Sequence, residues 1–163
     1  MKKTVTNLIS VFSMLFLIGN IDAQELKMTH KDSLNVLLDE YYELNLKVFQ
    51  AGSTLEDIDA IFNLFTDDFT YVHPKYGGDY TRQDLYIGYK RNLEKGSYNG
   101  RVADIKINNK IIGLKAATVN KSFIKKEDHQ IKDSNEQMSL FEFRDGRISK
   151  FSNSFAEFIL QCL

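Results

Sequence analysis

The strongest signal for the fold lies in residues 137–158, which read QMSLFEFRDGRISKFSNSFAEF. Apolar and polar side chains alternate along residues 137–143 and again along residues 148–158, as they do in strands with one buried face. Between the two runs, residues 144–147 (Arg-Asp-Gly-Arg) are a strong signal for a tight turn. The stretch therefore predicts an antiparallel hairpin near the end of the chain.

Outward from the hairpin, strand signals come late in the chain and helical signals come early. Alternating runs occupy residues 102–112 and 114–125, directly before the hairpin. Further upstream, apolar side chains recur at helical spacing in residues 33–50, 55–65 and 81–93. Helices followed by a run of antiparallel strands predict an α+β protein rather than a parallel α/β sheet.

The expected helices carry start and stop signals. Asp32 or Ser33 is expected to cap the first, and Ser53 with Glu56 would form a capping box for the second. Thr81 is expected to start the third, and Gly96 to end it.

The N-terminus predicts export. Lys2 and Lys3 precede the apolar run of residues 8–18, and Ala23 offers a small residue for cleavage, as in a Sec signal peptide. The apolar run is shorter than the roughly 20 residues that a membrane-spanning helix needs. We therefore expect residues 1–23 to be a signal peptide and residues 24–163 to be one domain. The mature protein is expected in the periplasm or the medium, without being embedded in a membrane.

Composition narrows the classes of function. A formal net charge of −1 gives no electrostatic reason to expect nucleic-acid binding. Cys162 is the single cysteine and has no partner for a disulfide within the chain. The histidines (His30, His73 and His129) lack metal-ligand spacing, and no cofactor-binding motif occurs. No metal and no cofactor are therefore expected.

Strand parity suggests how a pocket would be lined. In the hairpin, one parity set mixes aromatic and polar side chains, which suits a small-molecule pocket, although plain core packing is the alternative. That set includes Ser139, Phe141, Phe151, Asn153 and Phe155. In residues 114–125, the small polar set that contains Asn120 is expected to leave room for a ligand. Lys121 belongs to the other set, expected on a solvent face or a polar rim around Val119 and Phe123.

The order of the elements and four motifs resemble the nuclear transport factor 2-like superfamily, especially its SnoaL-like and ketosteroid-isomerase-like branches. The motifs are residues 56–69, 71–74, 78–89 and 141–148. The resemblance implies a cone-shaped, cystatin-like roll, in which a curved antiparallel sheet is closed by three helices around one pocket. It also implies a homodimer through the outer face of the sheet.

The resemblance directs attention to His73 and Tyr42. In isomerase-like members a carboxylate directly before a proline is the general base, and His73 stands at that position here. An imidazole titrates near neutrality and could also move a proton. Tyr42 is a candidate for the tyrosine that holds an oxyanion from the first helix.

These observations favour an exported SnoaL-like domain that binds a small apolar or amphipathic ligand without a cofactor. Its pocket walls would be Tyr71, Tyr89, Phe141, Phe151 and Phe155, and the polar orienting groups would be His73, Asn120, Ser139 and Asn153. One alternative is a lyase or isomerase with His73 as its general acid–base. Another is a non-catalytic dimerisation or interaction module whose interior is filled by its own side chains.

Overall fold

The computed structural model describes residues 29–73, 78–127 and 130–153. The predicted signal peptide (residues 1–23), Pro74 and Phe155 lie outside these ranges, so export and its cleavage site stay predictions. Within the described ranges, no helix combines the length and the apolar character needed to cross a membrane.

The first described helix, α2 (His30–Val48), begins earlier than the sequence suggested. The hydroxyl oxygen of Thr29 accepts from the backbone N–H of Asp32, and the Asp32 carboxylate accepts from the backbone N–H of Thr29. The expected cap at Asp32 or Ser33 is therefore wrong by one turn, because Asp32 is the third helical residue and completes a capping box. One face of α2 is buried, and it comprises Leu34, Leu38, Tyr41, Tyr42, Asn45 and Val48.

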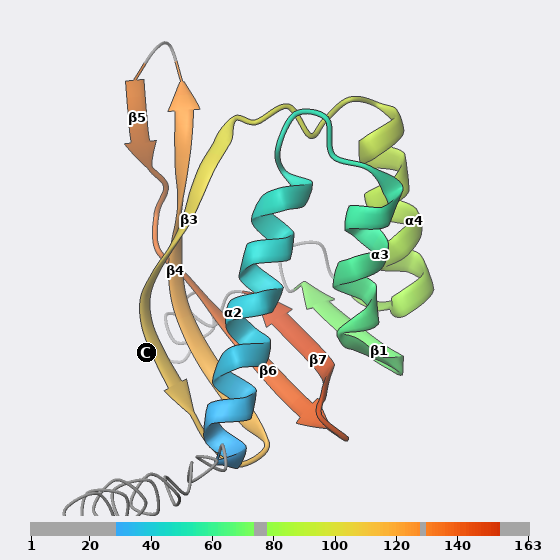
Figure 1. The fold of residues 1–163 in the computed structure, drawn as a ribbon, viewed down its shortest axis with the longest axis vertical. Coiled ribbons are helices and arrows are strands. Elements are labelled where there is room, and N and C mark those ends of the chain that lie inside the picture. The colour runs from blue at the N-terminus through green and yellow to red at the C-terminus, as the bar shows by residue number, and fades with distance from the viewer. Residues whose placement is uncertain (1–28, 74–77, 128–129, 154–163) are drawn as a thin grey trace, which may run out of the picture.

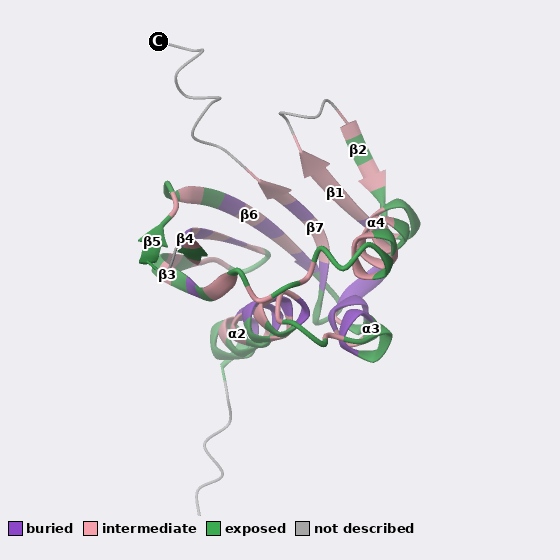
Figure 2. Cartoon of the chain, turned by 90° about the horizontal axis from the view of Figure 1, so that it is seen from above, coloured by how far each residue is buried: buried purple, intermediate pink, exposed green. Residues whose placement is uncertain are grey.

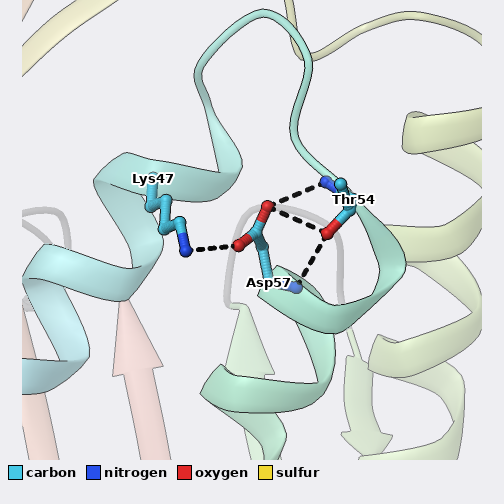
Figure 3. Close-up of polar contacts among 3 residues, drawn as sticks. All are labelled: Lys47, Thr54 and Asp57. Atoms are coloured by element: carbon cyan, nitrogen blue, oxygen red, sulfur yellow. Dashed lines mark hydrogen bonds and ion pairs between the residues drawn. The ribbon is translucent and has the colours of Figure 1, made fainter.

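Helix α3 (Leu55–Asn63) is joined to α2 by a polar contact at its start (Figure 3). Thr54, rather than Ser53, is the cap, and its partner is Asp57 rather than Glu56. The other carboxylate oxygen of Asp57 lies 2.7 Å from the Nζ of Lys47, near the end of α2. The carboxylate thus caps α3 and pairs with a lysine of α2.

Helix α4 (Arg82–Glu94) begins and ends where predicted. Thr81 and Asp84 form its capping box, and Gly96 follows the helix in a left-handed conformation with φ 65°. Glycine adopts this conformation without the steric cost that a Cβ would add.

Seven strands form one sheet in the order β2-β1-β7-β6-β4-β3, with β5 paired to the far end of β4. Their bounds are β1 Phe65–His73, β2 Gly78–Thr81, β3 Val102–Ile112, β4 Ala116–Glu127, β5 Gln130–Asp133, β6 Gln137–Arg144 and β7 Arg147–Asn153. The predicted hairpin is the pair β6 and β7, whose turn places Asp145 and Gly146 at positive φ.

The sheet is mixed. Five of its described pairings are antiparallel, as expected, but β1 and β7 run parallel, with Tyr71 beside Phe151. A parallel pair needs a long crossover connection, and here α4 and the strands β2 to β6 lie between the two partners in the chain. Alternation within one strand carries no information on such a distant pairing.

The three helices lie on one side of the curved, unclosed sheet (Figure 2). Helix α2 crosses the sheet and contacts β3, whereas α4 packs beside β1 and β2 (Figure 1). The predicted α+β architecture, with three helices in the N-terminal half against a curved sheet, is confirmed. The buried core lies between the helices and the concave face, and it includes Leu38, Ile58, Phe62, Phe69, Val119, Phe141 and Ile148.

Candidate functional site

A cavity of about 200 Å³ lies between the helices and the concave face of the sheet. Helices α2 and α4 and strands β1, β3, β4 and β7 contribute to it. The lining residues are Tyr41, Tyr42, Asn45, Phe49, Tyr71, Leu85, Tyr89, Ile105, Lys121, Phe123, Phe151 and Asn153. The lining is rich in aromatic side chains, and its cationic member is Lys121.

Lys121 is the distinctive feature of this cavity. Its residue surface is 3% exposed, and its Nζ donates to the hydroxyl of Ser139 at 2.8 Å. The same nitrogen lies 5.3 Å, 5.7 Å and 5.4 Å from the ring centroids of Tyr42, Phe123 and Phe151. No carboxylate is among the described lining residues. The amine is therefore surrounded by aromatic rings instead of a counter-charge.

A chain of hydrogen bonds continues from Lys121 along the sheet. The hydroxyl of Ser139 donates to Asn153 Oδ1 at 2.9 Å, and Asn153 Nδ2 donates to the Tyr71 hydroxyl at 3.1 Å. These residues come from β4, β6, β7 and β1, so the chain depends on the order of strands in the sheet. It fixes the orientation of Ser139 toward Lys121.

Burial shifts the titration of several groups in the cavity. It lowers the pKa of Lys121 from 10.5 to about 8, because the charged ammonium loses hydration. Burial also raises the pKa of Tyr41, Tyr42 and Tyr89 above that of an ordinary tyrosine. At neutral pH these phenols are hydrogen-bond donors without charge, and the amine is the cationic group in the cavity.

The two tyrosines of α2 differ in the hydrogen bonds of their hydroxyl groups. The Tyr41 hydroxyl accepts from Asn45 Nδ2 at 3.0 Å, one helical turn away. The Tyr42 hydroxyl lies near Ser139 but makes no hydrogen bond of normal geometry with the described residues. The ring of Tyr42 forms part of the cavity wall, with its centroid 5.3 Å from the Lys121 nitrogen.

Five of the predicted site residues do line the cavity, and they are Tyr42, Tyr71, Tyr89, Phe151 and Asn153. Two others lie behind its wall. Ser139 is fully buried and acts on the cavity through Lys121 and Asn153. Phe141 is also fully buried, with its ring centroid 5.4 Å from that of Tyr41 and 4.7 Å from that of Phe151.

The prediction for Asn120 is wrong. Asn120 pairs with Met138 in the β4–β6 register, and its side chain donates to Glu136 at 2.8 Å on the outer face of the sheet. Its neighbour Lys121 faces the cavity instead, because successive residues of a strand point to opposite faces. Phe155, the remaining predicted wall residue, lies outside the described residues.

His73 is not among the residues that line the cavity. It ends β1, where its ring makes an edge contact with Tyr71, at 5.8 Å between ring centroids. Tyr71 does line the cavity, so His73 is next to a wall residue. Its proposed role as a general acid–base stays a prediction.

Lys121 is not among the site residues predicted from the sequence, although its strand carries part of a signal for it. Lys121 shares its parity with Ala117 and Val119, which are buried, and with Phe123, which also lines the cavity. Three apolar members favour the inner face for this set. Lys115 and Lys125 share its parity, however, so the pattern alone did not assign the Lys121 amine to the interior.

A larger groove of about 600 Å³ lies outside the core, between the start of α2 and the β6–β7 turn. Much of its lining is exposed, including His30, Lys115, Arg144 and Asp145. None of the polar side chains among its described lining residues is buried, and for this reason we assign the candidate site to the smaller cavity. Across the described ranges, no three His, Cys, Asp or Glu side chains are grouped so that they could hold a metal ion.

Comparisons with known proteins support the fold. No protein-family model and no curated protein sequence matches the chain. Similar solved structures include an NTF2-like protein of Anabaena variabilis, 12% identical with a TM-score of 0.55, which covers 80% of this chain and 95% of that chain. An NTF2-like protein of unknown function from Burkholderia xenovorans is 15% identical with a TM-score of 0.54, covering 77% of this chain and 84% of that chain.

A third structure, from Methylobium petroleophilum, is described as a protein of unknown function with a cystatin-like fold. It is 13% identical with a TM-score of 0.54, and the match covers 77% of each chain. Identities this low establish the fold alone. The chain has the nuclear transport factor 2-like, cystatin-like fold.

Proposed function

We propose that this protein binds a small, single-ring aromatic ligand that carries one anionic or hydrogen-bond-accepting group. The observation that carries the proposal is the Lys121 amine, buried at the cavity wall with one hydrogen bond, to Ser139, among the described residues. An ammonium has three N–H donors, so it has donors left for a ligand. The aromatic lining would hold the body of the ligand.

The size of the cavity supports a ligand of one ring. A cavity of roughly 150 Å³ is known to accommodate benzene, and about 200 Å³ leaves room for a ring with a short substituent. A four-ring steroid would not fit without a rearrangement of Tyr41, Tyr89 or Phe151. The expected ligand is therefore small and amphipathic.

Benzoate is a suitable probe, because it combines one ring with one carboxylate. We expect saturable binding by isothermal titration calorimetry or by chemical-shift changes at cavity residues. Lys121→Met should weaken binding at least tenfold, since a hydrogen bond to a charged group contributes about 1.5–3 kcal/mol. Lys150→Met is the matched control, because Lys150 is a half-exposed lysine that pairs with Glu142.

Two results would overturn the proposal. One is the absence of benzoate binding to the wild-type protein at millimolar concentration. The other is equal affinity in the wild type and in Lys121→Met, which would separate binding from the buried amine.

A further inference from the structure

We propose that Lys121 captures small aromatic aldehydes by forming a reversible imine between its Nζ and the carbonyl carbon. The inference rests on the proposed function, because the aldehyde would occupy the same cavity. It adds a covalent step to what would otherwise be simple binding.

The hydrogen bonds around Lys121 leave its lone pair available once the amine is neutral. Ser139 accepts an N–H of Lys121 and donates its own hydroxyl proton to Asn153. Ser139 therefore has no proton left to donate to the nitrogen lone pair. The nitrogen also lies over the ring faces of Tyr42, Phe123 and Phe151, and the Tyr42 hydroxyl makes no hydrogen bond to it in the described structure.

The charges around the amine favour its neutral form. The titratable groups that line the cavity with Lys121 are phenols: Tyr41 and Tyr42 from α2, Tyr71 from β1 and Tyr89 from α4. His73 contacts Tyr71 from the end of β1. None of these groups is an anion at neutral pH that would hold the ammonium charged, and burial lowers the pKa of Lys121 to about 8. About half of the amine is then neutral at pH 8, against well under 1% for an ordinary lysine.

The reaction is balanced without a further reactant. The nitrogen lone pair attacks the carbonyl carbon, and the carbonyl π electrons move to oxygen, which takes up a proton. The carbinolamine then loses this oxygen as water, which carries away both amine hydrogens, and a carbon–nitrogen double bond remains. Hydrolysis reverses the step, so the capture is reversible.

Benzaldehyde with sodium cyanoborohydride tests the inference, because the reductant converts the imine to a stable benzyl amine. At pH 8 we expect the intact mass to increase by one benzyl group, and peptide mapping to place that group on Lys121. Labelling of Lys121 should be at least tenfold faster than that of any other lysine, in proportion to its larger neutral fraction. Lys121→Met should lose this fast phase, and Lys150→Met should keep it.

Benzoate titration of the same preparation separates failure of this inference from failure of the proposed function. Binding of benzoate without preferential labelling of Lys121 would overturn imine formation and leave the binding function intact. Absence of both would overturn both. Labelling spread evenly over the lysines, or unchanged in Lys121→Met, would also overturn the inference.

Discussion

Burying the Lys121 amine costs the folded protein free energy. Its pKa falls from 10.5 to about 8, which corresponds to a penalty on the order of 3 kcal/mol when the amine is charged. A stable core has no need of such a residue, since an apolar side chain of similar volume would pack there without the penalty. A buried lysine that lowers the stability of the folded protein is typical of a residue that serves function rather than packing.

The penalty predicts a pH-dependent effect of Lys121→Met. Below pH 8 the lysine is protonated in both the folded and the unfolded state, so the full penalty is present. Between pH 8 and 10.5 the unfolded state binds more protons, and the stability of the wild type rises with pH. We therefore expect Lys121→Met to raise the free energy of unfolding by about 1–3 kcal/mol at pH 7, and by much less near pH 10.

Urea denaturation of the wild type and the variant at the two pH values would measure this difference. Lys150→Met should change stability by less than about 0.5 kcal/mol, as expected for a surface substitution. A gain from Lys121→Met that is equal at both pH values would contradict ionisation of the amine as its cause.

At the scale of elements, each of the three described helices begins with the same device. Thr29, Thr54 and Thr81 cap α2, α3 and α4, and each is paired with an aspartate three residues later. Only Asp57, in α3, is also paired with a lysine of another helix, among the contacts of the described residues. Asp84 therefore provides only a cap, whereas Asp57 provides a cap and the pairing with Lys47 (Figure 3). The difference in stability between variants of these two aspartates measures what the contact between α2 and α3 contributes.

Asp57→Ala should lower the free energy of unfolding by about 1–2 kcal/mol, and Asp84→Ala by about 0.5–1 kcal/mol. The hydrogen bond from Lys47, followed by that from the backbone of Thr54, lowers the pKa of Asp57. Its contribution should therefore be present above the unfolded pKa of about 3.9, and it should disappear as pH falls through the lower folded value.

Denaturation of both variants at pH 7 and pH 3 would measure the two effects. Equal losses for Asp57→Ala and Asp84→Ala at pH 7 would show that the pairing with Lys47 adds nothing to capping.

At the scale of the whole molecule, the outer face of the sheet predicts self-association. Ser139 and Phe141 point into the core, so Met138 and Leu140 of the same strand point outward. Ile111 of β3, 66% exposed, pairs with Thr118, which in turn pairs with Leu140. Ile111 therefore lies on one side of Thr118 and Leu140 on the other, and with Met138 they make an apolar patch on β3 and β6. A patch of this kind fits the homodimer predicted from the sequence.

Light scattering on residues 24–163 should give twice the monomer mass, and Met138→Glu together with Leu140→Glu should give the monomer. Ile87→Glu is the control, because Ile87 is an exposed apolar residue of α4, away from this patch. A wild-type monomer would contradict the dimer, and dissociation by Ile87→Glu would place the interface elsewhere.

The local features of this protein could be predicted from its amino-acid sequence. Short-range signals predicted the three helices, the start of α4 at Thr81 and the β6–β7 hairpin, because caps, turns and periodicity act over a few residues. Strand parity together with the family resemblance grouped Tyr71, Tyr89, Phe151 and Asn153 into one candidate site, and all four line the cavity.

Two features could not be predicted in this way, namely which face of β4 turns inward and which distant strand pairs with β1. Alternation divides a strand into two sets of side chains but does not state which set the helices will cover. The helices cover the set that contains Lys121, and the parallel pairing of β1 with β7 places Tyr71 beside Phe151. Both outcomes depend on contacts between segments far apart in the chain, and these contacts place a lysine at the wall of an aromatic cavity.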